Sequence, residues 1–290
     1  DLKNNTTYYF QVTAVSGDNR LGGSDFDLAM AQAFCQETGM DFDHLTTGQQ
    51  ELLIRQAETC KIALTTQPMA MMVVSFDDVH ASLTITNEWL IRKCGRLFKR
   101  MTAPIQQVLR DAGLSPQALD ELVLVGGSSH MPSVRQYISK TLGMEPCQNS
   151  RPDTAIALGA GICAGMKARC ADIRELVLTD VCPFTLGVAV FNPEQPRRHR
   201  MCPIIERNSV LPSSKENVCW TIRDRQRRVD IEVYQGEPPY CQDNTLLGKL
   251  SVPVPQGPAG TPQVRVRFSF DINGLREVEC RTAIKEESAI

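Results

Sequence analysis

The fold class of the first half of the chain is decided by the stretch ELVLVGGSSHMPSVRQYI, residues 121–138. Its apolar run at residues 121–125 predicts a short buried strand, which stops at Gly126-Gly127. A helix is predicted from Pro132 to Leu142, because proline is favoured in the first turn of a helix. A strand that enters a glycine turn and continues into a helix is typical of an α/β fold.

Strands and helices alternate in the same way on both sides of this stretch. The periodicity predicts strands at residues 8–15, 69–76 and 81–85, and helices from Ser24 or Asp25 to about 38, at 47–64 and from 86 onward. Thr86 is expected to cap the last of these, with a kink or restart at Pro104. Asp153 opens a further helix, rich in alanine and glycine, against which another backbone is expected to pack closely.

The pattern changes after about residue 172. Short alternating segments at residues 218–222, 229–234, 264–270 and 275–280 are separated by turn residues and predict a β-sandwich. The apolar stretch IRELVLTDV, residues 173–181, lies between the two patterns. We therefore expect one domain over residues 1–172, a linker over 173–181 and a second domain over 182–290.

Composition narrows the function classes. The formal net charge is -2, which gives no electrostatic reason to expect nucleic acid as a partner. No apolar run approaches the ~20 residues that span a bilayer. The 11 cysteines have no C-x-x-C spacing and the 4 histidines lie far apart, so neither a disulfide framework nor a metal site is expected. Free thiols in a reducing cytoplasm are the simplest interpretation.

Two glycine pairs and one helix face are candidate sites for a nucleotide. Gly22-Gly23 and Gly126-Gly127 precede helices, where backbone N–H groups and the helix dipole favour an anion. Glycine pairs at strand ends are also common without any ligand. Glu58, Lys61 and Thr65 are spaced to share one helix face and could grip a ribose, although an exposed ion pair explains them equally simply.

Six segments resemble a known family. Residues 123–138 resemble the VLVGGSTRIPKVQ segment of the heat-shock-seventy (DnaK-like) molecular chaperones, and residues 151–165 resemble their NPDEAVAYGAAVQAA segment. The stretches GDNRLGGSDFD, ELVLTDVCPFTLGV, IIERNSVLPSS and VYQGE are similar to further family segments in family order. Several of them are closest to the minor bacterial heat-shock-cognate-C branch.

The resemblance implies a fold and a nucleotide site. It implies the rear part of an actin-like nucleotide-binding domain, then a β-sandwich peptide-binding domain, with ATP or ADP and Mg as cofactors. Its nucleotide-binding positions are Gly22, Gly23, Glu58, Lys61, Thr65, Gly126, Gly127, Ser128, His130 and Asp153. His130 stands where the family often has an arginine that stacks on adenine, and Ser24 replaces a glutamate near the phosphates.

The family's catalytic motifs DLGTT and GGGTFD do not occur in this sequence. Whether the chain is an enzyme is therefore left open, no catalytic residue is assigned, and useful ATP hydrolysis by the chain alone is not expected. The resemblance implies a piece that lacks the front ATPase lobe and the helical lid. Without a lid, bound peptide should dissociate quickly.

In the family, an extended peptide lies in a channel across the sandwich. The matching positions are Val188, Val190, Phe191, Cys219, Ile222, Val229 and Ile231. From their spacing alone these residues would be ordinary core. Cys219 stands where the family usually has phenylalanine, and Ile222 where bacterial members often have alanine, so the peptide preference is expected to be unusual.

Two further features bear on this channel. Leu176, Val177 and Leu178 match the apolar linker that docks on the nucleotide-binding domain when ATP is bound, and the alternative of a merely flexible linker fits poorly with three adjacent apolar residues. Arginines cluster at residues 197–200 and 223–228. They could favour acidic flanks around a peptide, or they could be solvated loop tips.

We expect an ATP-regulated cytoplasmic chaperone of the stress response and protein folding, whose partners are unfolded polypeptides and a J-domain co-chaperone, with no nucleic-acid or membrane partner. A truncated peptide-binding module without nucleotide function is the first alternative. An actin-like sugar kinase is the second, and the predicted sandwich and apolar linker argue against it.

Overall fold

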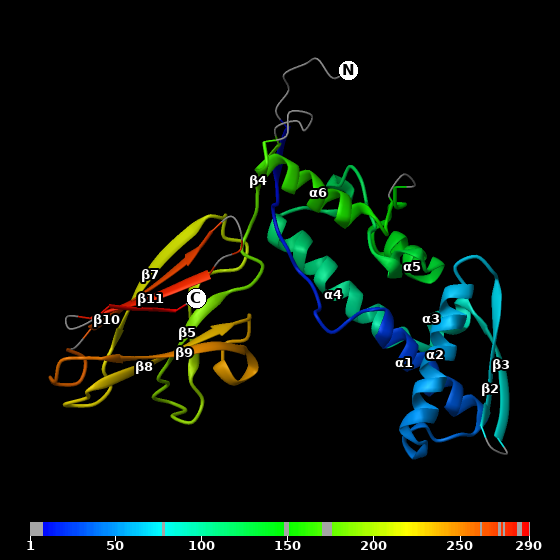
Figure 1. Cartoon of the computed structure of the whole chain (residues 1–290), viewed down its shortest axis with the longest axis horizontal. Helices are drawn as coiled ribbons and strands as arrows, with labels where there is room; N and C mark the ends of the chain where they lie inside the picture. The colour runs from blue at the N-terminus through cyan, green and yellow to red at the C-terminus, as the bar shows by residue number, and fades with distance from the viewer. Residues whose placement is uncertain are drawn as a thin grey trace. The chain divides into compact units, whose positions relative to one another are not determined.

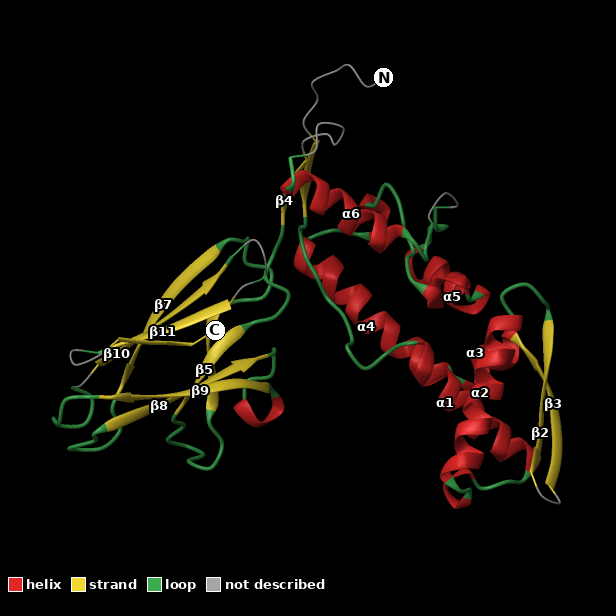
Figure 2. Ribbon diagram, viewed as in Figure 1, coloured by secondary structure: helices red, strands yellow, loops and turns green. Residues whose placement is uncertain are grey.

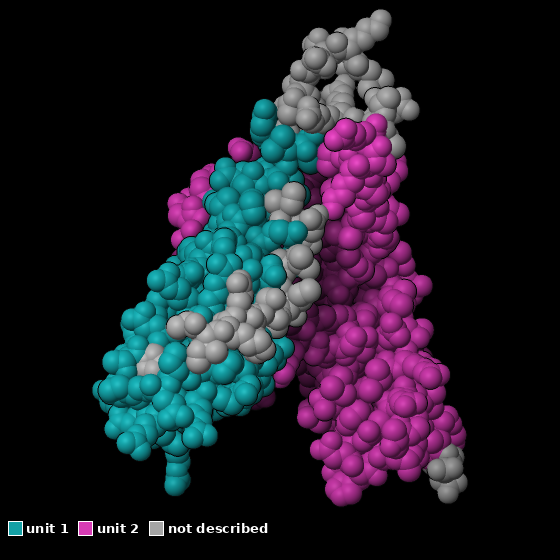
Figure 3. Space-filling model, turned by 60° about the vertical axis from the view of Figure 1, so that its left-hand side comes forward, with its two compact units in different colours: residues 1–15, 175–290 teal, residues 16–174 magenta. Residues whose placement is uncertain are grey.

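The computed structural model describes residues 8–76, 79–147, 151–169, 176–261, 263–271, 274, 276–282 and 286–289. The chain divides into two compact units, which Figure 3 distinguishes by colour. One is Ser16–Arg174, and the other joins Asp1–Val15 to Glu175–Ile290. The expected mixture of helices and several sheets is confirmed. We describe each unit by itself.

The unit Ser16–Arg174 is mostly helical, with one β-hairpin (Figures 1 and 2). Its helices are α1 (Gly23–Thr38), α2 (Thr47–Ala63), α3 (Asn87–Lys93), α4 (Gly95–Ala112), α5 (Pro132–Leu142) and α6 (Ala155–Lys167). Short 3-10 turns are η1 (Phe42–His44), η2 (Pro116–Ala118) and η3 (Gly127–His130). Strands β2 (Met69–Phe76) and β3 (Val79–Thr86) pair antiparallel, which confirms the predicted strand pair.

Local capping explains where these helices begin. Thr46 accepts a hydrogen bond from the Gln49 N–H, and the Gln49 side chain accepts one from the Thr46 N–H, so α2 starts with a capping box. Thr86 caps α3, as predicted, by accepting from the Trp89 N–H. The expected cap of α1 at Ser24 or Asp25 is wrong. Gly22 is its cap residue, and the Asp25 carboxylate accepts from the Gly22 N–H at 2.7 Å.

One hydrophobic core holds this unit together. Helices α1 to α3 and the hairpin contribute Phe34, Leu53, Met72 and Leu90, all without exposed surface. On β2 the buried residues alternate with exposed ones, because successive side chains of a strand point to opposite faces. The core includes buried Cys94, and burial raises the pKa of its thiol to about 12. Such cysteines act as small apolar residues.

The predicted strand at residues 121–125 does not form. The segment is extended, and the carbonyl of Leu122 accepts from the Cys147 N–H at 2.8 Å, but no described strand pairs with it. Leu122 and Leu124 pack on the core, whereas Val123 and Val125 are 55% and 47% exposed. The alternation of a half-buried strand is present, but a ladder needs a partner, and the described residues supply none here.

Two helix predictions also need correction. Helix α4 runs through Pro104 without interruption, and the break falls at Cys94, which leaves helical geometry just before Gly95. Glycine has low helix propensity, which favours the restart at that point. Helix α6 begins at Ala155 rather than Asp153, and it has no buried residue. Among the described residues no atom lies within 4 Å of a Cβ placed on Gly159 or Gly161, so the expected close backbone packing is not seen at these two glycines.

The second unit contains two four-stranded antiparallel sheets. Their strand orders are β12-β11-β10-β7 and β6-β5-β8-β9. The strands are β5 (Leu186–Val190), β6 (Arg200–Ile205), β7 (Ser213–Trp220), β8 (Arg228–Gln235), β9 (Thr245–Pro253), β10 (Gln263–Phe270), β11 (Arg276–Arg281) and β12 (Glu286–Ala289), with the 3-10 turn η4 (Cys241–Asp243). One hydrophobic core draws on both sheets, including Val188 and Val252 from one and Val266 and Phe268 from the other.

A small parallel sheet belongs to the same unit. Strand β4 (Leu176–Thr179) lies in the predicted linker and pairs with β1 (Tyr8–Gln11) near the beginning of the chain. The pairing continues with the Val12 N–H, which donates to the Thr179 carbonyl at 2.8 Å. This explains why Asp1–Val15 groups with the sheets rather than with the helices. Linker residues 173–175 lie outside the described residues, and the expected domain boundaries remain a prediction.

Candidate functional site

The centre of the predicted nucleotide site is a buried ion pair between α1 and α2. The Lys61 ammonium lies 2.7 Å from both carboxylate oxygens of Asp27 and donates to the Gly23 carbonyl at 3.2 Å. The side chains of Lys61 and Asp27 are 11% and 7% exposed. Helix α2 places Lys61 in its last turn, so the side chain reaches the first turns of α1. Sequence reasoning identified Lys61 and Gly23 but missed Asp27.

The electrostatics of Asp27 follow from this burial. Burial raises the pKa of the Asp27 carboxyl, and the hydrogen bond and charge of Lys61 oppose that rise. A smaller effect in the raising direction comes from the negative charge of Glu58. The three residues therefore interact electrostatically, which brings Glu58, a predicted ribose ligand, to the same site.

Gly23 forms a cradle between the two helices and η3. A Cβ at this position would lie 3.2 Å from the Lys61 Nζ and 3.4 Å from the Ser128 Oγ. Gly23, Lys61 and Ser128, three residues predicted to bind nucleotide from distant parts of the sequence, therefore meet at one point. The absence of a side chain leaves space at which polar groups converge.

One predicted residue, Thr65, is placed differently than expected, and the backbone N–H of another, Gly22, already has a partner. Thr65 lies in the turn that follows α2, not on its face, and its hydroxyl donates to the Ile62 carbonyl at 2.7 Å. Gly22 is the residue that precedes α1, and its N–H is taken by the Asp25 carboxylate. The i, i+3, i+4 spacing holds for Glu58 and Lys61 only, because the helix ends before Thr65.

The second half of the predicted site joins η3 to the start of α6. His130 Nε2 lies 2.9 and 3.0 Å from the two carboxylate oxygens of Asp153. The Gly126 N–H donates to the Pro152 carbonyl at 3.0 Å, and Gly126 has a φ of 85° that favours glycine. Ser128 and His130 lie in the same short η3 turn, so the two halves of the site are adjacent.

These residues fit the nucleoside part of a nucleotide better than a bare metal ion. The described residues contain no group of three or more His, Cys, Asp or Glu side chains that could hold a metal. The Gly23 cradle, the Ser128 hydroxyl, the Glu58 carboxylate and the Lys61 ammonium are the donors and acceptors that sugar hydroxyls require. Any Mg would therefore be held mainly through phosphate oxygens, as is usual for this ion.

A separate candidate site lies between strands of the two four-stranded sheets. It is a cavity of about 740 Å³. Strands β5, β6, β7, β8 and β9 all contribute to its lining. Apolar side chains form part of the wall, with Val229 and Ile231 buried at 8% and 2% exposure. Large apolar residues at the mouth are more open, since Phe191, Trp220 and Ile222 are 45%, 54% and 55% exposed.

Most of the predicted peptide-binding residues meet at this cavity. Its lining includes Val190, Phe191, Cys219, Ile222, Val229 and Ile231. Val188 does not line the cavity, because it points into the core and has no exposed surface. Val188 fits the alternative of an ordinary core residue, and Val229 and Ile231, which belong to the same core, fit both that alternative and the cavity wall.

Sequence reasoning missed twelve of the lining residues, among them Cys202, Asn217 and Trp220. Cys202 lies on strand β6, opposite Val188 of the neighbouring strand β5. The side-chain amide of Asn217 donates to the Cys202 sulfur at 3.3 Å. Trp220 ends β7 at the mouth. The sequence did contain a signal for Trp220, because this large apolar residue follows the mostly polar residues 213–217 of the same strand. None existed for Cys202.

Cys219 has an unusual environment for a cavity residue. Burial raises the pKa of its thiol to about 11, and the nearby Cys202 sulfur adds to the effect. The thiol is therefore protonated and acts as a small apolar group. It contributes space and an apolar surface to the cavity rather than a reactive nucleophile.

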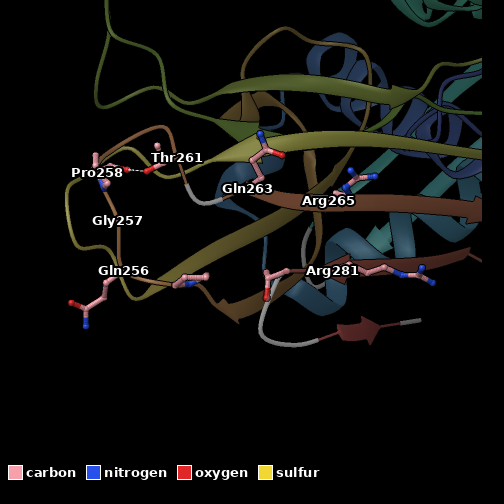
Figure 4. A pocket seen from close by; sticks show the side chains of 9 residues that line it. Gln256, Gly257, Pro258, Thr261, Gln263, Arg265 and Arg281 are labelled. Atoms are coloured by element: carbon pink, nitrogen blue, oxygen red, sulfur yellow. Dashed lines mark hydrogen bonds between the residues drawn. The ribbon is translucent and has the colours of Figure 1, made fainter.

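This unit contains a second cavity. It has a volume of about 730 Å³ and is lined by the loop 255–261 together with residues from β10 and the end of β11 (Figure 4). Arg265 and Arg281 extend along it, but each has a carboxylate partner at 3.3 Å, Glu216 and Glu279 respectively. Thr261 donates to the Pro258 carbonyl within the loop. We assign no ligand to this cavity.

The linker residues are held by their backbone rather than by burial. Strand β4 contains Leu176, Val177 and Leu178 and pairs with β1 over its whole length. Val177 and Leu178 are nevertheless 40% and 51% exposed. These two side chains are therefore available to contact another surface. In the part of the chain that is described, no helix is both long and apolar enough to span a bilayer.

Comparison with known proteins gives a consistent result. The family described as Hsp70 protein matches residues 6–289. The chaperone protein DnaK from each of two strains of Thermus thermophilus is 36% identical to this chain over 287 residues. Both matches cover 94% of this chain and 45% of the relative. The chain thus spans less than half the length of the curated relatives it matches.

Proposed function

Because the chain belongs to the Hsp70 family of chaperones, we propose that it binds extended apolar segments of unfolded polypeptides in the cavity between its two four-stranded sheets. In this proposal the two sheets form a β-sandwich peptide-binding domain. The nucleotide state of an actin-like domain, formed by the helical unit, regulates peptide affinity through the linker. The relatives it matches carry the name chaperone protein DnaK.

The observation that carries the proposal is the cavity itself. Its volume of about 740 Å³ suits a few side chains of an extended chain, and its deep wall is apolar at Val229 and Ile231. Phe191 and Ile222 come from the ends of two different loops and expose large apolar surface at the mouth. Exposed apolar groups around a hollow are typical of sites that bind apolar partners.

Peptide binding is tested by fluorescence anisotropy with a labelled peptide that has a leucine-rich core. Val229→Phe should abolish binding, because the added ring occupies the cavity. Val210→Phe is the matched control, since Val210 is 54% exposed and does not line the cavity. The double variant Phe191→Ser/Ile222→Ser removes only exposed apolar surface and should weaken binding without affecting folding. Equal binding by all four proteins, or none by the folded wild type, would contradict the proposal.

For the helical unit, we propose that ATP or ADP binds beside the Gly23 cradle. Glu58 and Lys61 would hold the ribose, Ser128 and Gly127 would line the nucleoside pocket, and His130 would lie against the base. Thr65 and Asp153 would bound the pocket, while Gly22 and Gly126 shape the turns. With Mg bound to its phosphates, the nucleotide would supply the binding energy that shifts the domain between two states.

Gly23→Ala is the sharpest test of that site. The new methyl group would stand 3.2 Å from Lys61 Nζ and 3.4 Å from Ser128 Oγ, and so would fill the cradle. Alanine is also the better helix former, so stability should not fall. Isothermal titration with ADP and Mg should show weaker binding than wild type. Gly48→Ala, in the first turn of α2 with open space around it, is the matched control. Unchanged affinity in Gly23→Ala would count against the site.

The alternative of a peptide-binding module without nucleotide function is favoured by one observation. The Lys61 ammonium is already neutralised by Asp27 and bonded to Gly23. If the titration detects no nucleotide while the anisotropy assay detects peptide, this alternative is correct. A J-domain co-chaperone is the proposed partner only if nucleotide binds.

The proposed switch is the pairing of β4 with β1. Because this pairing uses backbone hydrogen bonds, it is able to form and break without repacking a core. Hydrogen exchange at the amides of residues 176–179 should slow when nucleotide is added. Exchange that does not respond to a nucleotide shown to bind would separate the linker from regulation.

A further inference from the structure

Two loops border the proposed peptide cavity, and both are rich in arginine. The first runs from the end of β5 to β6 and contributes Phe191 and His199 to the lining. The second runs from β7 to β8 and contributes Ile222 and Gln226. Each loop supplies lining residues near both of its ends, and Arg200, Arg223, Arg225 and Arg227 are each next in sequence to one of them.

The charge of this rim is opposite in sign to that of the chain. Residues 191–200 and 221–228 contain seven arginines and two acidic residues, Glu194 and Asp224, hence a net formal charge of +5. The whole chain has a net charge of -2. All seven arginines are exposed. Outside these two segments the lining adds Lys249, Asp230 and Glu232, a net charge of -1, so the positive charge is concentrated in the two loops beside the cavity.

Most of these arginines have no acidic partner. Arg198 pairs with Asp243 at 3.0 Å and lies over the Tyr240 ring, and Arg228 donates to the side chain and carbonyl of Ser251. Within the described residues the remaining five form no ion pair. We call these five the arginine rim: Arg197, Arg200, Arg223, Arg225 and Arg227. The cavity of Figure 4 differs, because the guanidinium groups of Arg265 and Arg281 each have a carboxylate partner there.

The backbone that carries the rim is fixed in shape. The Arg225 N–H donates to the Gly257 carbonyl, and the Ala259 N–H donates to the Asp224 carboxylate, both at 2.8 Å. The first loop is tied in a similar way, since the Gln242 side chain donates to the Arg197 carbonyl at 3.1 Å. The charges are therefore held near the cavity before any ligand arrives, which lowers the entropy lost on binding.

We propose that the cavity selects apolar polypeptide segments flanked by aspartate or glutamate, because the arginine rim lies around an apolar wall. This inference rests on the proposed peptide-binding function. The apolar wall at Val229 and Ile231 takes the central side chains, and the arginine rim takes the acidic flanks. Exposed ion pairs contribute mainly to selectivity and association rate, and salt weakens them.

The test uses three labelled peptides with one leucine-rich core and flanks of serine, aspartate or lysine. At low salt the aspartate-flanked peptide should bind about tenfold more tightly than the lysine-flanked one, with serine between them. The difference should shrink markedly in about 0.5 M salt, where the Debye length falls to a few ångströms. Anisotropy with the whole chain measures all three.

A charge variant with a matched control assigns the effect to the rim. Arg223→Gln/Arg227→Gln should remove most of the preference while leaving binding of the serine-flanked peptide unchanged. Arg265→Gln/Arg267→Gln makes the same charge change on the exposed face of β10, at residues that do not line the cavity, and should keep the preference. Equal loss in both variants would overturn the assignment to the rim.

The outcomes separate this inference from the proposed function. If none of the three peptides binds, the peptide-binding function itself is wrong. If the serine-flanked peptide binds but the aspartate and lysine flanks are equivalent, or lysine is preferred, only the present inference fails. If polyglutamate of equal length binds as tightly as the aspartate-flanked peptide, the rim is a general anion site and the role of the apolar wall is refuted.

Discussion

Replacing Lys61 with methionine tests the buried ion pair at the centre of the candidate nucleotide site. The side chains of Lys61 and Asp27 are 11% and 7% exposed, with both carboxylate oxygens 2.7 Å from Nζ. Removing one partner of a buried pair costs about 3–5 kcal/mol. We expect about 3 kcal/mol at pH 7, because methionine keeps the aliphatic stem and Asp27 can take up a proton. For a unit of this size the Tm should fall by roughly 6–12 °C.

The loss should depend on pH in a defined direction. Burial raises the pKa of Asp27 and Lys61 opposes that rise, so the pKa rises further when Lys61 is removed. A carboxyl whose pKa is higher in the folded than in the unfolded state stabilises the fold when it is protonated. This contribution is fully present below the pKa of the unfolded state, about 4, and is lost as the pH rises through the pKa of the folded state. The difference in unfolding free energy between wild type and variant should therefore be smaller at pH 5 than at pH 7.

Urea unfolding followed by tryptophan fluorescence measures both effects. Trp89 is 5% exposed and belongs to the helical unit, so a Trp220→Phe background makes the signal specific to that unit. Arg100→Met is the control, since Arg100 and Asp18 are 42% and 28% exposed and should contribute about 0–1 kcal/mol. Equal losses in the two variants, or a loss in the Lys61 variant that does not change between pH 5 and 7, would refute the reasoning.

Three further predictions concern the unit with the four-stranded sheets and the cysteines. Gly187→Ala should lower the stability of that unit by roughly 1–3 kcal/mol, because the added methyl group would collide with a backbone carbonyl of β6. Gly248→Ala, with open space around the new methyl group, should change the stability little. Thermal unfolding followed by circular dichroism compares the two variants. Iodoacetamide should modify Cys219 far more slowly than the exposed Cys163. The reason is that a pKa of about 11 leaves only about one Cys219 thiol in a thousand ionised at pH 8. Comparable modification rates of the two cysteines by mass spectrometry would contradict the buried environment of Cys219. Val177→Pro should break the pairing of β4 with β1 and speed hydrogen exchange at residues 9–12. Unchanged protection of these amides would show that they are not protected by pairing with β4.

Local periodicity was enough to predict most of the elements. Helices α2 and α5 and the hairpin of β2 and β3 lie close to where apolar spacing, capping residues and prolines placed them. These signals are local, because a cap or a periodic face needs only neighbouring residues. The segment at residues 121–125 failed for the same reason. Its alternation is that of a strand, but a strand also needs a partner.

The candidate sites show the same difference between local signals, which the sequence displays, and long-range contacts, which it does not. Glycine spacing and family resemblance pointed to Gly23, Lys61 and Ser128, and to six of the residues that line the cavity. Asp27 was not singled out, because nothing in its immediate sequence distinguishes a buried ion-pair partner from an ordinary residue of an acidic first helix. Val188 and Val190 share a spacing that predicts one face of a strand, yet only Val190 lines the cavity.

Motifs and periodicity along the chain were enough for the family, the succession of most helices and strands, and the residue types available to each site. Three-dimensional packing was needed to learn that β4 pairs with β1, that Lys61 is neutralised by Asp27, and that Val229 and Ile231 line one cavity. The difference arises from the separation along the chain over which each effect acts. Propensity and periodicity act over a few residues, whereas pairing, burial and electrostatic field depend on which distant segments meet in space.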